Sequence, residues 1–464
     1  MLVSSVDAKQ FVTIERINVT AVGQQAGGGQ HPAVSGDGRF VAFWSDSNII
    51  VPGDTNNTPD IFVRDRQTSQ VKIASVASGG TPQANAISYA EMDISTGGNL
   101  VVYASDGSNL VNGDTNGVTD VFLYDVGVNQ TARISLANGG VQANGRSYRP
   151  VISGNGLLVA YRSDATNLVA NDNNAQPDIF IYDRVVNQVA QVNLSSSGAQ
   201  SNAEDPASGI AINDDGKFVA FDSRGSNLVN TDTNNSPDVF VRDRSSGKTI
   251  RMSVSTAGSQ ANGASSLPTI SGDGRFVAFM SSASNLVADD SNSASDIFLH
   301  DRDTDNDNIF DEDGAISTVR ISISTEGAQT NGSSTAPSID GAGRYISFWS
   351  IASNLVTKDT NGVGDIFVYD RKTGVTTRSS VGRNGEQANG ASAFFNSISN
   401  DSRFIGFESL ATNLVANDTN GASDVFLAQA GPAAPTQLVA KGVSTSQIDL
   451  TWKDNANDEQ RYIV

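Results

Sequence analysis

One short acidic pattern recurs seven times along the chain, and its residue types are those that bind metal ions. It runs Asp-x-Asn-x-x-x-Asp and precedes a short apolar segment each time. Aspartate and asparagine supply the hard oxygen ligands that Ca²⁺ prefers, while backbone carbonyls and water complete its coordination. The pattern therefore predicts a calcium site in each copy. The predicted ligands are Asp54, Asn56 and Asp60; Asp114, Asn116 and Asp120; Asp172, Asn174 and Asp178; Asp232, Asn234 and Asp238; Asp290, Asn292 and Asp296; Asp359, Asn361 and Asp365; and Asp418, Asn420 and Asp424.

The same residues have a purely structural explanation. Aspartate and asparagine side chains also bond to the backbone two residues further on, in Asx-turns that order a loop before a strand. The outer aspartates occur in every copy, whereas the third and fifth copies vary in the middle, at Asn173 and Ser291. Both explanations stay open, and different copies can follow different ones.

A second acidic segment lies within the fifth repeat, at residues 303–313, and reads Asp-Thr-Asp-Asn-Asp-Asn-Ile-Phe-Asp-Glu-Asp. It resembles the calcium loops of EF-hand and thrombospondin type 3 modules, although Asn308 stands where these loops usually have glycine. Asparagine tolerates the left-handed backbone that such a turn needs. The resemblance implies that Asp303, Asp305, Asp307 and Asp311 bind Ca²⁺, together with the carbonyl of Ile309. The alternative is a solvated acidic hairpin.

The elements that position these loops follow from the spacing of the repeats. The leading aspartates are 60, 58, 60, 58, 69 and 59 residues apart. Within one copy, the segments 268–271, 275–279, 296–299 and 318–323 have the short, alternating apolar pattern of strands, and an Asp-Gly turn joins the first two. Seven such copies predict an all-β fold, a seven-bladed β-propeller of four-stranded antiparallel blades. A linear solenoid is the alternative.

The two ends of the repeat array favour the propeller. The last copy has only three strands before Gly431-Pro432, while residues 12–19 match the fourth strands of other copies. An N-terminal strand that completes the last blade closes a ring and removes its open edges. A solenoid has no use for such a displaced strand.

Two runs carry a family resemblance, Ser-Gly-Asp-Gly-Arg-Phe-Val-Ala-Phe at 271–279 and Asp-Ile-Phe-Val-Arg-Asp-Arg at 60–66. They resemble the repeat of bacterial TolB-like propellers over residues 11–431. The resemblance implies the fold and an exported bacterial protein. The α/β domain that precedes the propeller in TolB has no counterpart here, so TolB's envelope partner is not carried over.

The two ends of the chain differ from the propeller repeats. Residues 1–10 are predicted to be an N-terminal tail and contain no expected signal peptide. Residues 432–464 resemble the first strands of a fibronectin type III domain, which needs seven strands over roughly a hundred residues. The segment is therefore predicted to be an incomplete domain of a larger modular protein.

Charge and composition exclude several classes of partner. The formal net charge is −20, which argues against binding to nucleic acid and to anionic membranes. No apolar run is long enough to span a bilayer, so no membrane insertion is expected. Cysteine is absent, which excludes disulfides, thiolate metal sites and a cysteine nucleophile.

Function follows less directly from the sequence than the fold does. No catalytic constellation is recognisable, so the prediction is a calcium-binding, non-enzymatic interaction or scaffold module, monomeric within its larger chain. It would bind a protein or glycan on its loop face, outside the cell, at the cell surface or in the periplasm. The alternative is a polysaccharide-degrading or other hydrolytic enzyme that uses carboxylates at the central channel; a regulatory propeller is a third possibility. Non-repeated polar residues clustered at the channel mouth would favour the enzyme, and scattered ones the scaffold.

Overall fold

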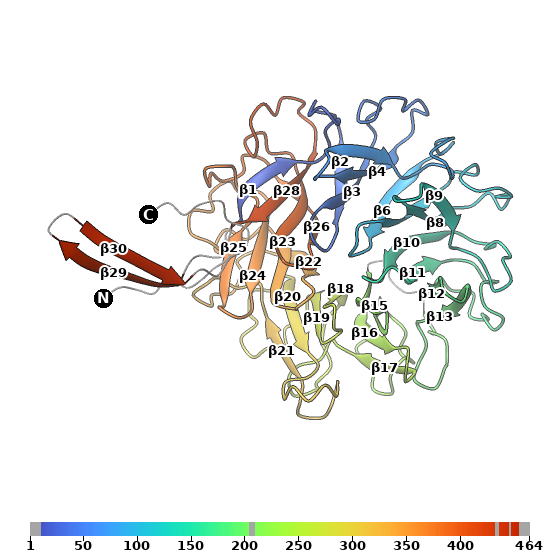
Figure 1. Cartoon of the computed structure of the whole chain (residues 1–464). Helices are drawn as coiled ribbons and strands as arrows, with labels where there is room; N and C mark the ends of the chain where they lie inside the picture. The colour runs from blue at the N-terminus through green and yellow to red at the C-terminus, as the bar shows by residue number, and fades with distance from the viewer. Residues whose placement is uncertain (1–10, 204–208, 432–435, 445–446, 454–464) are drawn as a thin grey trace.

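Seven four-stranded antiparallel sheets form a ring around a central axis (Figure 1). The computed structural model describes residues 11–203, 209–431, 436–444 and 447–453, and every regular element in these ranges is a strand. From the axis outward, the blades are β2 (Gly29–Val34), β3 (Phe40–Ser45), β4 (Asp60–Asp65), β5 (Gln70–Ile73); β6 (Ser88–Ile94), β7 (Leu100–Ser105), β8 (Asp120–Asp125), β9 (Gln130–Arg133); β10 (Ser147–Ile152), β11 (Leu158–Ser163), β12 (Asp178–Asp183), β13 (Gln188–Gln191); β14 (Ile210–Ile212), β15 (Phe218–Ser223), β16 (Asp238–Asp243), β17 (Lys248–Arg251); β18 (Ser265–Ile270), β19 (Phe276–Ser281), β20 (Asp296–Asp301), β21 (Ser317–Arg320); β22 (Ser334–Ile339), β23 (Tyr345–Ser350), β24 (Asp365–Asp370), β25 (Val375–Arg378); and β26 (Ser392–Ile398), β27 (Phe404–Ser409), β28 (Asp424–Ala430), β1 (Phe11–Arg16). The predicted seven-bladed propeller is confirmed.

The N-terminal strand closes the ring, as predicted. β1 pairs antiparallel with β28, from Phe11 opposite Ala430 to Arg16 opposite Phe426. The strand itself is shorter than the predicted 12–19, but the chain beyond it still follows blade 7. The N–H of Ile17 donates to the carbonyl of Val425 at 2.8 Å. This pairing excludes the solenoid.

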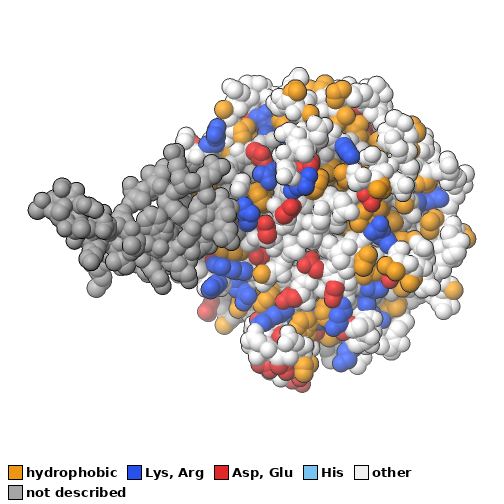
Figure 2. All heavy atoms as spheres, in the orientation of Figure 1, with side chains coloured by type: hydrophobic (Ala, Val, Ile, Leu, Met, Phe, Trp, Pro, Cys, Tyr) orange, Lys and Arg blue, Asp and Glu red, His pale blue; other side chains and the backbone are white. Residues whose placement is uncertain are grey.

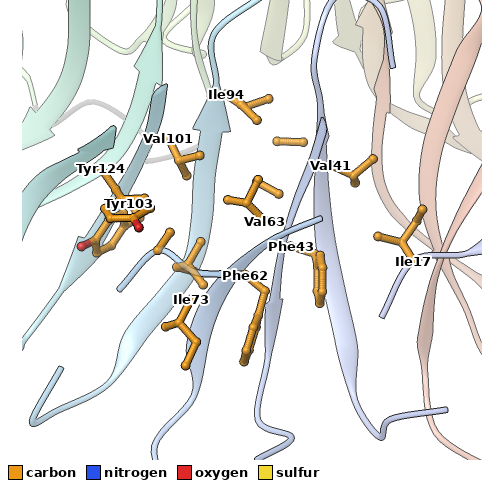
Figure 3. Packing of buried hydrophobic residues seen from close by; sticks show 14 of the residues in the cluster. Ile17, Val41, Phe43, Phe62, Val63, Ile73, Ile94, Val101, Tyr103 and Tyr124 are labelled. Atoms are coloured by element: carbon orange, nitrogen blue, oxygen red, sulfur yellow. The ribbon is translucent and has the colours of Figure 1, made fainter. Parts of the chain in front are cut away.

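The core lies between neighbouring blades and is built by the second and third strands. Phe43 on β3 lies opposite Phe62 on β4, with ring centroids 5.6 Å apart (Figure 3). Both side chains are fully buried, because strands in the middle of a blade are covered on both faces by adjacent blades. One apolar residue from the loop after each second strand is buried among these rings as well: Ile50, Leu110, Leu168, Leu228, Leu286, Leu355 and Leu414 are at most 2% exposed.

Charged side chains of both signs alternate around the middle of the ring face that Figure 2 shows. The blades contain ion pairs such as Arg275 with Asp301 and Arg344 with Asp370, at 2.7 and 2.8 Å. These pairs join the start of a second strand to the end of the third strand of the same blade. The net negative charge therefore does not form one continuous patch on this face.

One end of the axis is closed by a ring of backbone hydrogen bonds. In each blade the turn between the first and second strands donates an N–H to the next blade's turn, at 2.9–3.1 Å. The donors and acceptors are Gly36 to Thr96, Thr96 to Gly154, Asn155 to Asp214, Asp214 to Gly272, Gly272 to Gly341, Gly341 to Asn400 and Asp401 to Gly36.

Side chains fill the centre of this ring. Asn400 Nδ2 donates to Asp214 Oδ2 at 3.0 Å, joining blades 7 and 4 across the axis. Gly272 and Gly341 leave room for these two side chains. A Cβ at Gly272 would lie 2.4 Å from Asp214 Oδ2, and a Cβ at Gly341 would lie 1.4 Å from Asn400 Oδ1. A cavity of about 180 Å³ lies next to these side chains and is lined by the inner strands. The central channel is thus closed at this end.

The described part of the C-terminal segment is a hairpin of β29 (Thr436–Ser444) and β30 (Gln447–Lys453). Nothing in it or in the comparisons below shows a fibronectin type III domain, so the predicted domain boundaries stay predictions. The predicted tail 1–10 and the end of the chain, 454–464, lie outside the described residues. In the described ranges there is no helix long and apolar enough to cross a membrane.

Candidate functional site

In every repeated acidic loop the motif asparagine makes the Asx-turn that the structural alternative describes. In blade 4, Asn234 Oδ1 accepts the N–H of Ser236 at 2.9 Å, and Asn234 Nδ2 donates to Asp238 Oδ2 and to the carbonyl of Ala261. Asp238 is fully buried and its Oδ1 accepts the hydroxyl of Ser253 at 2.5 Å. The last aspartate is fully buried in every copy: Asp60, Asp120, Asp178, Asp238, Asp296, Asp365 and Asp424.

In five blades an arginine from the fourth strand lies between the two aspartates of the motif. Arg133 Nη1 in blade 2 is 3.0 Å from Asp114 Oδ1 and 3.3 Å from Asp120 Oδ2. The other four arginines make the same bridge: Arg16, Arg251, Arg320 and Arg378. The protein therefore supplies the positive charge at these five places. Calcium binding by the predicted ligands stays a prediction.

The acidic insertion of blade 5 brings part of its predicted ligand set together. One carboxylate oxygen each from Asp303, Asp305 and Asp307 lies within 4.8 Å of the others, so this group can hold a metal ion. Asp303 is buried, and its two oxygens accept the N–H groups of Asp307 and Asn308.

Two other predicted ligands of this insertion have different surroundings. Asp311 forms a two-point ion pair with the buried Arg302, with an Nε to Oδ1 distance of 2.9 Å. Ile309 is 55% exposed, and its N–H donates to Asp307. The pairing to Arg302 makes Asp311 part of the blade rather than of the three-carboxylate group.

At the open end of the axis, the inner strands carry bulges. The register of β2, β10, β18 and β22 against their neighbours shifts near the start of each strand. The bulged residue has a positive φ of 49–54° and precedes a proline; these residues are His31, Arg149, Leu267 and Ala336. β6 and β26 shift at the same place, near Glu91 and Phe394–Phe395. Strained backbone of this kind gathers at functional sites.

We call His31, Glu91, Arg149, Phe394 and Phe395 the axial mouth. Arg149 Nε lies 3.5 Å from Glu91 Oε1, and both side chains are 36% exposed. The imidazole of His31 stacks on Phe395, with ring centroids 3.5 Å apart. Burial, and then the positive charge of Arg149, lower the pKa of His31 to about 4. The imidazole is therefore neutral at pH 7.

Buried carboxylates of the second strands hold the bulges in place. Glu408 accepts the N–H of His31 and the hydroxyl of Ser423, and burial raises the pKa of this carboxyl. Asp222, 1% exposed, accepts the N–H of Leu267 at 3.3 Å. These carboxylates fix the backbone from which the side chains of the mouth project.

Sequence reasoning missed most of the axial mouth and all five bridging arginines. Aligning the repeats would have shown that His31, Arg149, Leu267 and Ala336 each precede a proline at one repeat position and differ only in side chain. The same alignment would have placed an arginine two residues before the buried serine or asparagine of the fourth strand in five copies.

Comparison with known proteins shows the fold. No protein-family model and no curated protein matches this sequence. An oligogalacturonate lyase from Vibrio parahaemolyticus has a TM-score of 0.50 at 10% identity, over 91% of this chain and 98% of that one. A prolyl endopeptidase has a TM-score of 0.50 at 11% identity, over 90% of this chain and 52% of that one. A putative TolB from Agrobacterium tumefaciens has a TM-score of 0.40 at 14% identity, over 80% and 98%.

These findings correct the predicted function. The prediction of a calcium-binding, non-enzymatic scaffold is wrong as the leading interpretation, because enzymes are among the structural neighbours and nothing shows a calcium-binding scaffold. The prediction that the chain is not an enzyme is likewise unsupported. The non-repeated His31, Glu91 and Arg149 gather at the axial mouth, which is the arrangement expected for the enzyme alternative.

Proposed function

We propose that this propeller is an enzyme that cleaves an acidic oligosaccharide by β-elimination at the axial mouth. The observation that carries the proposal is the geometry of the axial mouth, where the imidazole of His31 stacks on Phe395 at 3.5 Å and Arg149 lies 3.5 Å from Glu91. His31 and Arg149 combine a group that can accept a proton with a fixed positive charge. The occurrence of an oligogalacturonate lyase, named for an oligomer of an acidic sugar, among the structural neighbours is compatible with this substrate class.

The mouth offers complementary groups for such a sugar. A guanidinium pairs with a carboxylate through two parallel hydrogen bonds, and Glu91 orients Arg149 for this role. Phe394 and Phe395 are 49% and 39% exposed, and Phe394 meets Trp349 edge-on at 5.9 Å. Exposed aromatic faces pack against the apolar face of a sugar ring.

In the reaction, His31 removes the proton from the carbon next to the sugar carboxylate. The electron pair of that C–H bond forms a carbon–carbon double bond as the glycosidic C–O bond breaks. The leaving oxygen takes a proton from the imidazolium or from solvent, so no water is consumed. Arg149 stabilises the negative charge that develops on the carboxylate as the proton leaves. Electrostatic stabilisation of this kind is usually the largest single contribution to catalysis.

Hydrolysis is less well supported by the same residues. It needs one protonated and one ionised carboxyl group facing the bond to be broken. Among the described carboxylates near the bulges, Glu408 and Asp222 accept backbone N–H groups, and Glu91 is paired with Arg149. Elimination needs only the base and the positive charge.

The test is cleavage of oligogalacturonate, with a neutral xylo-oligosaccharide as the comparison substrate. Ultraviolet absorbance of the new double bond and product masses that sum to the substrate mass are expected. His31→Asn, which tolerates the positive φ, should lose activity at least about 100-fold, and Arg149→Met should raise KM. Arg146→Met, at an exposed arginine nearby, should keep wild-type rates. Products heavier by one water, or full activity in His31→Asn with unchanged folding, would reject the mechanism.

For the three-carboxylate group of the blade-5 insertion we propose Ca²⁺ as the ion, because all of its identified ligands are carboxylates. Calcium should protect the insertion from proteolysis in the wild type and fail to do so in Asp305→Asn. Equal protection by Mg²⁺ alone would reject this choice of ion.

An acidic oligosaccharide substrate also fits an extracellular, cell-surface or periplasmic location, which we propose for the protein. Fractionation of the source cells tests it, and recovery in the cytosolic fraction alone would reject it.

A further inference from the structure

Two blades lack the bridging arginine, although their motif aspartates are present. In the arginine blades this residue lies opposite the phenylalanine of the third strand, as Arg133 does opposite Phe122. At the same register, blade 3 has Gln191 opposite Phe180 and blade 1 has Ile73 opposite Phe62. Neither side chain carries a charge. The two aspartates of these blades therefore have no counter-ion from the fourth strand.

Blade 3 shows the consequence for its carboxylates. Both oxygens of Asp172 and Oδ2 of Asp178 are buried and have no hydrogen-bond partner, and Asp178 is fully buried as a residue. Of the motif aspartates, all of which lie in the described ranges, only these two and Asp54 of blade 1 have such oxygens. Burial, and then the charge of Asp178, raise the pKa of Asp172 to about 6.

The glutamine between the blades has also turned away from the acidic pair in blade 3. Gln260 in blade 4 donates to Asp232 at 2.8 Å, as Gln329 and Gln387 do to their own leading aspartates. Gln200 in blade 3 instead donates to Gln191 Oε1 and to the carbonyl of Asn171. Blade 3 thus lacks both the arginine and the glutamine donor that reach the leading aspartate in blades 4–7. In blade 2 the glutamine also donates to a backbone carbonyl, that of Gly113, but this blade keeps its arginine.

We propose that blade 3 binds a divalent metal cation of the calcium class between Asp172 and Asp178. The cation takes the place that the guanidinium nitrogen occupies in blade 2, where one atom lies 3.0 and 3.3 Å from the two carboxylates. Buried carboxylates need such a partner, because an uncompensated charge in a protein interior is strongly unfavourable. Two carboxylates and water molecules supply oxygen ligands, the kind that calcium takes.

Blade 1 is the weaker case, and the proposal does not extend to it. Both oxygens of Asp60 accept hydrogen bonds, from Ser75 and from Asn56. Only one oxygen of Asp54 is left without a partner. The proposed site in blade 3 is separate from the axial mouth, so it stands or falls independently of the proposed enzyme function.

The test compares calcium binding by the full chain and by Gln191→Arg, which places in blade 3 the charge that the other blades have. Calcium titration calorimetry and thermal unfolding follow removal of metal by a chelator. The wild type should bind one more calcium ion than Gln191→Arg, and the variant should melt higher without metal and gain less from calcium. Gln188→Arg, an exposed residue of the same strand, adds the same charge elsewhere and should bind calcium as the wild type does.

Two outcomes would overturn the proposal. One is an equal number of calcium ions in the wild type and in Gln191→Arg. The other is the absence of calcium binding at this site, together with a gain in wild-type stability below about pH 6 that Gln191→Arg lacks; the pair would then share a proton rather than a metal. Calcium at the blade-5 insertion does not disturb the comparison, because that segment is identical in all three proteins.

Discussion

Replacing Arg133 by methionine should destabilise the propeller far more than its position near the surface suggests. The side chain of Arg133 is 7% exposed, and those of Asp114 and Asp120 are 5% and 0% exposed. Methionine keeps an unbranched apolar chain of similar reach but removes the charge. Loss of one partner from a buried ion pair costs about 3–5 kcal/mol, because the remaining charge is buried without compensation. For a cooperative ring of this size, that corresponds to a Tm lower by roughly 3–6 °C.

The pH dependence gives a second readout for Arg133→Met. Burial and the charge of Asp120 raise the pKa of Asp114, and Arg133 opposes them. Without the arginine the pKa of Asp114 rises further above its unfolded value. A group with a raised folded pKa favours the folded state as pH falls, so the deficit of the variant should shrink between pH 7 and pH 5.

The assay is denaturant unfolding at both pH values, with Arg146→Met as the matched control. Arg146 pairs with Asp164 at 3.0 Å, the same distance, but is 62% exposed. Exposed pairs contribute about 0–1 kcal/mol. If both variants lose the same free energy of unfolding, or if the deficit of Arg133→Met does not change with pH, the assignment of the arginine as a buried counter-ion is refuted.

Two further predictions concern the axis and the blade packing. Gly274→Ala should cost more than Gly327→Ala: both glycines have φ near +80°, but a Cβ at Gly274 would lie 2.3 Å from Phe218, whereas the space at Gly327 is open. Unfolding free energies should differ by about 1–3 kcal/mol, and equal losses would contradict the packing argument. Burial raises the pKa of Asp93 on β6 to about 6, so its contribution to wild-type stability should grow by roughly 1–3 kcal/mol as pH falls from about 7 to 4. Asp93→Asn should lack that part of the pH dependence, and an unchanged slope in the variant would contradict it.

Local patterns predicted the fold well because a propeller blade is built from neighbours in sequence. The alternation in residues 275–279 and the Asp-Gly turn before it specify a strand and a hairpin without knowledge of the rest of the chain. The displaced strand at residues 12–19 could be recognised because it matches a repeat position. Its last residues leave the ladder after Arg16, a detail set by contacts with blade 7.

The candidate sites were less predictable because each combines residues from different repeats or strands. Arg133 reaches Asp114 only through the register of β9 on β8, and no spacing rule states that register. His31 and Phe395 belong to the first and last blades and meet only when the ring closes. Sequence reasoning left open which of the seven acidic copies bind metal, because the residue that distinguishes them lies on another strand.

Ring closure by β1 also determines how late in synthesis the fold can be completed. Asn18 bonds to Asp424 across 406 residues of chain, so the first strand leaves the ribosome long before its partner exists. At about 5–20 residues per second, translation alone leaves β1 waiting for roughly 20–80 s. Throughout that interval β1 has no strand to pair with, and the edge of β28 that it covers can pair with another nascent chain until β1 reaches it. Synthesis, more than the finished ring, is the stage at which this protein most needs protection from its own copies.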